Sequence, residues 1–198
     1  MIKSKSKLTS LIIVIIGFLY VVGCSFHSKT IQSIDDIPVN EKIQTNFFGA
    51  TFSDKKDSVI AKFESADLEP QKMGKSSELM KFICKKADHV TFAHMEWDYV
   101  DVLFRNDKFC RIRFINTYET KDSAMVECYR ILKKVSAKYQ LKDLNVDDVP
   151  KCSAGATGKD VNDYVVAVFC DSVLSKKRYA TKLVYGSMKI IKEADEEL

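Results

Sequence analysis

The chain is poor in the residues from which most enzyme sites are built. Its 198 residues include three histidines, one tryptophan, three prolines and seven glycines. No Gly-x-Ser-x-Gly, His-Glu-x-x-His or Cys-x-x-Cys pattern occurs, so the common hydrolase, metalloprotease and thiol oxidoreductase arrangements lack their parts. We therefore predict no catalytic residue, no metal site and no cofactor.

The chain also lacks a strong excess of one charge. It has 31 Lys and Arg against 27 Asp and Glu, and the first 23 residues hold three of the lysines and no acidic residue. After that segment 28 basic and 27 acidic residues remain, which gives no electrostatic reason to expect nucleic acid as a partner. The 46% hydrophobic content and the length are typical of one globular domain.

The longest apolar run is too short to cross a bilayer. Residues 11–22 are uncharged and follow Lys3, Lys5 and Lys7. As a helix this run would span roughly 18 Å, against about 30 Å for the hydrocarbon core. A basic segment followed by a short apolar run is typical of an export signal.

The four residues Val21-Val22-Gly23-Cys24 resemble the lipobox of bacterial lipoproteins, with Val21 in place of the leucine that is commonest there. The resemblance implies cleavage after Gly23 and lipid attachment to Cys24, and several acyl chains would anchor the protein stably in a membrane. Ser25 after the cysteine implies the outer rather than the inner membrane of the cell envelope. An ordinary secretory signal and an uncleaved short anchor are the alternatives.

The composition divides the chain after the signal at residues 1–23. Residues 24–45 are polar and are expected to form the lipidated N-terminus and a tether, residues 46–192 a single domain, and residues 193–198 an acidic tail.

Apolar spacing predicts a helix at residues 121–139, with Thr120 or Asp122 as its N-cap. A shorter helix is expected at residues 54–65, capped by Ser53. Residues 77–86 fit a helix or a strand.

Alternating segments predict two strand pairs. Residues 97–105 and 108–116 indicate a hairpin, and residues 163–171 and 177–189 a second antiparallel pair. The predicted fold is α+β, an antiparallel sheet with helices packed on one face and two similar halves at residues 47–116 and 120–190.

This element order, with Phe47 to Phe52 before the first helix, resembles the β-lactamase-inhibitor-protein-like architecture of small exported domains and the related small lipoproteins of outer-membrane assembly. The resemblance implies a protein that binds other proteins through its sheet face or loops. We therefore expect a non-catalytic binding module for another envelope protein or envelope component.

One strand offers a candidate contact surface. Phe109, Arg111 and Arg113 combine arginine with apolar surface, as interface anchors do. A plain solvent-facing strand and a second buried layer are the other interpretations.

The alternative function is an envelope hydrolase. Glu96, Asp98 and Asp101 could supply paired carboxylates, although a solvated strand face also explains them.

Two other segments imitate ligand-binding loops. Residues 153–160 resemble a phosphate-binding loop without its first glycine and its magnesium ligand, and we expect a mobile loop there. Residues 143–147 resemble a calcium loop but lack its turn glycine and its final carboxylate.

Five cysteines remain after Cys24, and their spacing does not indicate a disulfide framework. Cys110, Cys128 and Cys170 are expected to be buried as small apolar side chains. The other two are Cys84 and Cys152.

Overall fold

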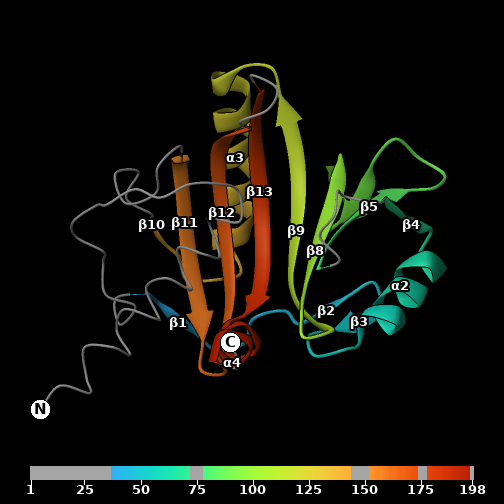
Figure 1. The fold of residues 1–198 in the computed structure, drawn as a ribbon. Helices are drawn as coiled ribbons and strands as arrows, with labels where there is room; N and C mark the ends of the chain where they lie inside the picture. Colours follow the sequence, from blue (N-terminus) through green and yellow to red (C-terminus); the bar gives the residue numbers. More distant parts are fainter. Residues whose placement is uncertain (1–36, 72–77, 144–151, 174–177, 197–198) are drawn as a thin grey trace, which may run out of the picture.

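The computed structural model describes residues 37–71, 78–143, 152–173 and 178–196, which form an α+β fold, as the sequence predicted (Figure 1). The helices in these residues are α2 (Lys56–Ser65), α3 (Lys121–Ser136) and α4 (Met188–Glu196). The strands are β1 (Val39–Asn40), β2 (Asn46–Phe47), β3 (Ala50–Thr51), β4 (Leu68–Gln71), β5 (Leu79–Cys84), β6 (Val90–Phe92), β7 (Met95–Trp97), β8 (Tyr99–Arg105), β9 (Lys108–Tyr118), β10 (Lys142–Asp143), β11 (Cys152–Asp160), β12 (Tyr164–Val173) and β13 (Arg178–Ser187).

One large mixed sheet organises the molecule. Its strand order is β1-β11-β12-β13-β9-β8-β5-β4, and β10 also pairs with β11. The β1–β11 pair is parallel and the other pairs are antiparallel. At the far edge, β4 contains Pro70, which lacks a backbone N–H and suits an outer strand. The β9–β13 pair joins the two predicted groups of strands into one sheet.

The predicted hairpin is present as β8 and β9. Asn106 and Asp107 join the strands with φ angles of 47° and 63°, the left-handed pair that a two-residue hairpin turn requires. Val100 lies opposite Phe114 and Val102 opposite Ile112, so the apolar sides expected from the alternation meet. The second predicted pair is present as β12 and β13.

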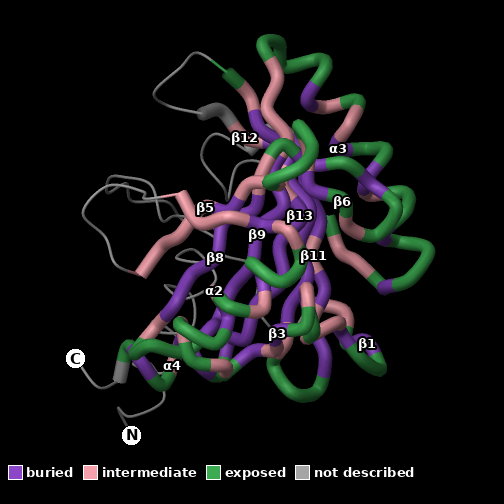
Figure 2. Tube along the Cα trace, turned by 90° about the vertical axis from the view of Figure 1, so that its right-hand side faces the viewer, coloured by how far each residue is buried: buried purple, intermediate pink, exposed green. Residues whose placement is uncertain are grey.

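The amphipathic helix α3 lies along one side of the sheet (Figure 2). The predicted cap is confirmed, because the side chain of Thr120 accepts a hydrogen bond from the Ser123 backbone N–H at 3.2 Å. The hydroxyl of Thr181 on β13 donates to the Ala124 carbonyl at 2.7 Å and fixes the helix on the sheet. Ala124, Cys128, Ile131 and Val135 are buried beneath it.

Aromatic rings fill the core between the sheet and the segments that cover it. Phe47 lies among five other rings, with centroid distances of 5.1 to 6.2 Å. Phe92 of β6 stacks on Phe114 of β9 at 4.0 Å. These contacts fasten the two small sheets, β2–β3 and β6–β7, to the large one.

The folded domain begins before the predicted boundary at residue 46. Val39 and Asn40 pair with Lys159 and Asp160, and Ile43 is fully buried. The predicted tether at residues 24–45 is therefore wrong for its described part. The polar composition of this segment suggested a tether, but here a polar residue holds the chain to the domain. The Asn40 side chain donates to the backbone carbonyls of Lys159 in β11 and of Gln140 after α3.

The expected mobile loop at residues 153–160 is the strand β11. Small residues suggested a loop, but here they allow close packing, since Ala154 and Ala156 are buried. A Cβ on Gly158 would stand 2.4 Å from the Gln140 carbonyl oxygen, so the neighbouring segment leaves no room for a side chain. The calcium-like segment at residues 143–147 lies mostly outside the described residues.

Three further predictions need correction or completion. The first helix starts at Lys56 and is not capped by Ser53, whose φ is 79°, outside the extended range of an N-cap. Residues 79–84 are a strand. The predicted acidic tail is helical up to Glu196, with Ala194 buried.

No helix in the described ranges has the length and apolar content that crossing a membrane would need.

Candidate functional site

The predicted contact surface is not exposed. Phe109, Arg111 and Arg113 are 0%, 1% and 7% exposed. A register shift between Leu103 and Phe104 separates Phe109 from the arginines, because it turns the Phe109 ring toward the aromatic core. The interpretation as a second buried layer therefore describes these residues better.

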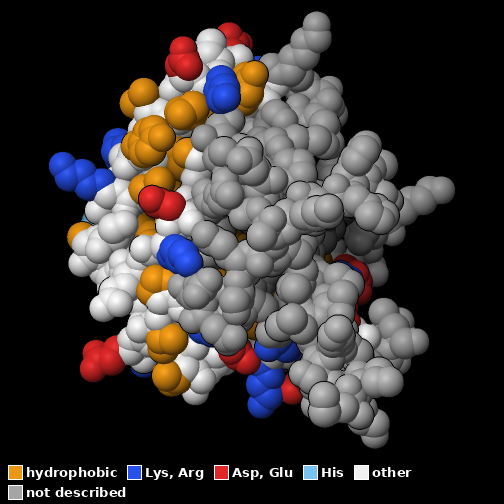
Figure 3. Space-filling view, turned by 90° about the vertical axis from the view of Figure 1, so that its left-hand side faces the viewer, with side chains coloured by type: hydrophobic (Ala, Val, Ile, Leu, Met, Phe, Trp, Pro, Cys, Tyr) orange, Lys and Arg blue, Asp and Glu red, His pale blue; other side chains and the backbone are white. Residues whose placement is uncertain are grey.

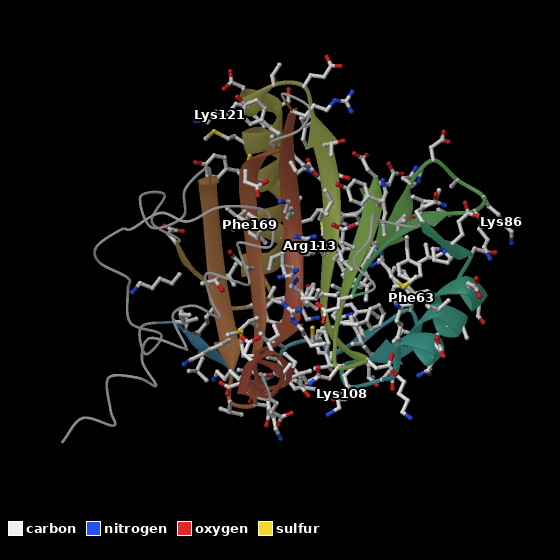
Figure 4. The ribbon with its side chains drawn as sticks, viewed as in Figure 1. Phe63, Lys86, Lys108, Arg113, Lys121 and Phe169 are labelled. Atoms are coloured by element: carbon white, nitrogen blue, oxygen red, sulfur yellow. The ribbon has the colours of Figure 1, made fainter. Side chains whose placement is uncertain are left out.

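Arg113 is held by an ion pair within the sheet face. Its Nη2 lies 2.8 Å from Asp101 Oδ2, and the two side chains are 9% and 5% exposed. Asp101 lies directly opposite Arg113 in register, on the neighbouring strand. Figure 4 shows Arg113 over the middle strands of the sheet.

The buried charges continue along the same face. Lys182 of β13 lies 2.6 Å from Asp171 of β12. Burial lowers the pKa of Lys182, and Asp171 opposes this shift. Burial also raises the pKa of Tyr99 to about 12, with Asp101 adding to the shift. These charges are paired with one another, which suits a structural layer.

An open polar cleft lies at the end of β9 that reaches Tyr118. It has a volume of about 580 Å³ and is built from the β6–β7 hairpin, the end of β9 and the outer side of α3. Its lining consists of Asp88, His89, His94, Met95, Glu96, Trp97, Asp98, Asn116, Thr117, Tyr118, Glu127 and Arg130.

The first wall is the β6–β7 hairpin, which turns at Ala93 and His94 with φ angles of 53° and 56°. On the hairpin side, His89 Nε2 lies 3.2 Å from Glu96 Oε1. Lys134 of α3 reaches the His94 carbonyl at 3.5 Å. The buried Trp97 ring closes the base, and its Nε1 donates to the Phe92 carbonyl at 3.3 Å.

Side-chain hydrogen bonds hold the cleft at the end of β9. Asp98 Oδ2 accepts from the backbone N–H of Thr117 at 2.8 Å and from its hydroxyl at 2.7 Å. Asn116 Oδ1 accepts from the Asp98 N–H at 2.8 Å, and its Nδ2 donates to the Glu96 carbonyl at 2.9 Å. These bonds fix the segment between β7 and β8 against β9.

The wall on α3 carries a charge pair. Arg130 Nε donates to Glu127 Oε2 at 2.6 Å, one helical turn away. Burial raises the pKa of the neighbouring Tyr118 to about 12, and Glu127 adds to the shift. The whole cleft contains four carboxylates against one arginine, so it favours a positively charged ligand.

The three carboxylates of the hydrolase alternative do not share one site. Glu96 and Asp98 line the cleft, while Asp101 lies outside its lining and is paired with Arg113. A glycosidase needs two carboxylates that face one bond, whereas here Glu96 is paired with His89 and Asp98 accepts two hydrogen bonds from Thr117. Among the described residues no group of three or more His, Cys, Asp or Glu side chains is arranged to hold a metal ion.

The sequence did not reveal the cleft. His89 and His94 flank β6, and both line the cleft. The useful signal was the alternation of Val90-Thr91-Phe92 and Met95-Glu96-Trp97 around two turn residues, which is a short hairpin pattern.

The remaining predicted positions are simpler to place. Cys110, Cys128 and Cys170 are buried as expected, and Cys84 is half-buried. Cys24, the predicted lipid attachment residue, lies outside the described residues.

No family model, curated protein or solved structure matches the chain.

Proposed function

We propose that the protein is a non-catalytic lipoprotein of the bacterial cell envelope that binds a positively charged segment of another envelope protein or component. The basic segment, the short apolar run and Cys24 support export and lipid anchoring. Ser25 supports the outer membrane. The observation that carries the binding role is the cleft, in which four carboxylates surround an open volume of about 580 Å³.

The position of the cleft supports this role. It lies at the end of the sheet where β9 reaches Tyr118, whereas the chain enters the domain beside Asp160 at the other end. In a protein tethered through its N-terminus, the cleft is therefore at the end of the domain farther from the point where the tether joins it.

We also infer that α2 and α3 cover a common face of the sheet. Phe82, Phe114 and Leu183 are aligned across β5, β8, β9 and β13, so they share one face. The α2 helix contacts this face through Phe63, whose ring lies 4.8 Å from Phe82. The α3 helix contacts it through Thr181, two residues before Leu183.

The order of elements supports two similar halves. In residues 47–116 the helix α2 is followed by β4 and β5, the small β6–β7 hairpin, and then β8 and β9. In residues 120–190 the helix α3 is followed by the short β10 and then by β11, β12 and β13. We place the cleft where these two halves meet, between α3 and the end of β9.

The single tryptophan offers a direct test, because Trp97 lines the cleft. We expect its fluorescence to change on titration with a hexalysine peptide and to stay constant with a hexaglutamate peptide. The double variant Asp88→Asn/Glu96→Gln should weaken hexalysine binding about tenfold or more, the equivalent of ~1.4 kcal/mol for the two charges.

The matched control is Glu64→Gln, an exposed acidic residue of α2 that does not line the cleft. It should bind hexalysine as the wild type does. Equal binding by all three proteins would contradict the proposed role of the cleft, whatever the state of Cys24. Mass spectrometry of the N-terminal peptide tests the lipid anchor separately.

A further inference from the structure

One corner of the molecule exposes apolar side chains where the chain enters the domain. In the described part of the chain four large apolar residues are exposed: Val39 at 51%, Val126 at 70%, Tyr129 at 57% and Val161 at 76%. Val126 and Tyr129 lie on α3. Val39 pairs with Lys159 and Asn40 with Asp160, so Val161 comes directly after the end of β11 that pairs with β1.

Figure 3 agrees with this separation. On the side where β1 and β11 lie, hydrophobic side chains gather near the lower end, apart from a larger group toward the upper end. The lower end is also where β1, the turn from β11 to β12, and α4 lie in Figure 1.

The turn that presents Val161 is fixed by a buried carboxylate. Asp160 is 2% exposed, and its Oδ1 accepts from the N–H groups of Asn162 and Tyr164 at 2.9 and 3.1 Å. Its Oδ2 accepts from the Ile43 N–H at 3.0 Å. One side chain therefore holds both the turn and the incoming chain, and an apolar residue is displayed where polar residues are usual.

The preceding chain joins the domain at this corner, so the corner is the end of the domain nearer to the anchor along the chain. Cys24 and Ile37 are 13 positions apart, which allows at most about 45 Å when fully extended. The 11-residue strand β9 alone spans about 37 Å. The turn lies at its Lys108 end, since Tyr164 pairs with Ser187 and Gly186 with Arg111, and the cleft lies at its Tyr118 end.

We propose that Val161, with Val39 beside it, contacts the surface of the lipid bilayer to which Cys24 is attached. This inference rests on the proposed lipid anchor. The local charges permit it, because the acidic residues Asp163 and Glu193 are paired with Lys192 at 3.4 Å and with Lys189 at 4.0 Å. One valine adds little to membrane affinity beside several acyl chains, but at a fixed turn it sets the orientation and turns the cleft away from the membrane.

The test uses the full lipidated protein in phosphatidylcholine vesicles, with and without lipids brominated near the headgroup. Val161→Trp introduces a reporter at the turn, and Val126→Trp is the control at a similarly exposed valine on α3. Trp97 is buried in both variants and gives the same background.

We expect brominated lipid to reduce the added Val161→Trp emission about twofold, as for a side chain seated ~5–10 Å into the interface, and to leave Val126→Trp nearly unchanged. Equal emission with both lipids at Val161, or equal quenching at both positions, overturns the proposal. Should Val161→Trp not fold, Val39→Trp reports on the same corner under the same criteria.

The outcomes separate the two proposals. A Cys24 peptide without lipid in the mass spectrum overturns the proposed anchor. A lipidated Cys24 together with an unquenched turn overturns only the membrane contact of Val161.

Discussion

Asn40 binds both backbone groups of Gln140. Its Oδ1 accepts from the Gln140 N–H at 2.6 Å, and its Nδ2 donates to the Gln140 carbonyl at 3.0 Å. Nδ2 also approaches the Lys159 carbonyl at 3.3 Å. One buried amide therefore joins the incoming chain to the segment after α3 and to β11, across a sequence separation of 100 residues.

Asn40→Ala should lower the free energy of unfolding by about 1–3 kcal/mol, because it removes the hydrogen bonds that join the incoming chain to Gln140 and Lys159. Urea unfolding followed by circular dichroism measures this change. The control is Val39→Ala at the adjacent exposed position, which should be nearly neutral. Equal stabilities of the two variants would contradict a structural role for the amide.

Gly158→Ala should be destabilising for a related reason. The added Cβ would stand 2.4 Å from the Gln140 oxygen and 2.9 Å from Asn40 Nδ2. We expect a loss of about 1–3 kcal/mol, the usual cost of overpacking. Because both substitutions disturb the same contact, the double variant Asn40→Ala/Gly158→Ala should lose less than the two single losses combined. Additive losses in urea unfolding would show that the sites are independent.

Local signals made part of the fold predictable. The alternation on either side of Asn106 and Asp107 specifies the β8–β9 hairpin, since the turn residues and the apolar sides agree. The helix α3 was equally predictable from the sequence, because its Thr120 cap and its apolar stripe are local features. Both depend on residues close together in the sequence.

The unpredicted parts depend on distant neighbours. The small residues of β11 become interpretable once α3 and Gln140 are seen against them. The register shift at Leu103 and Phe104, which separates Phe109 from Arg111, leaves no pattern in the sequence. The cleft combines residues 88–98, 116–118 and 127–130, and only the sheet brings these segments together.

Breaking the buried pair between Asp101 and Arg113 should be costly. Asp101→Ala leaves the Arg113 charge buried without its carboxylate, and we expect the free energy of unfolding to fall by about 3–5 kcal/mol. The control is Lys86→Ala, which removes the exposed pair between Asp67 and Lys86 and should cost ~0–1 kcal/mol. Urea unfolding of the two variants measures both losses in the free energy of unfolding. Similar losses would disprove that the Asp101–Arg113 pair stabilises the fold as a buried ion pair.

The Cys110 thiol should make stability fall at alkaline pH. Burial raises its pKa from 9.0 to about 12. Between these values the unfolded state binds fewer protons than the folded state, so the contribution is complete below pH 9 and is lost as the pH rises toward 12. Replacing the thiol by Cys110→Ala should remove this loss, up to ~1.4 kcal/mol for each pH unit in that window.

The comparison with Cys110→Ala isolates the thiol. Lys182 acts in the opposite direction, because its pKa is lowered and the unfolded state binds the extra proton. That contribution is present in both proteins. Unfolding free energies in urea at pH 8 and pH 10 should therefore differ more in the wild type than in the variant, and parallel pH profiles would exclude a role for Cys110.

Asp98 allows charge and position in the cleft to be separated. Asp98→Asn keeps an oxygen that can accept from the Thr117 N–H, so stability should change by less than ~1 kcal/mol while hexalysine binding weakens. Asp98→Ala removes the acceptor as well, frees the segment between β7 and β8, and should weaken both binding and stability. Trp97 fluorescence titrations and urea unfolding measure the two effects. If Asp98→Asn binds hexalysine as the wild type does, the attraction of the cleft for cations comes from Asp88 and Glu96, and the contribution of Asp98 is purely structural.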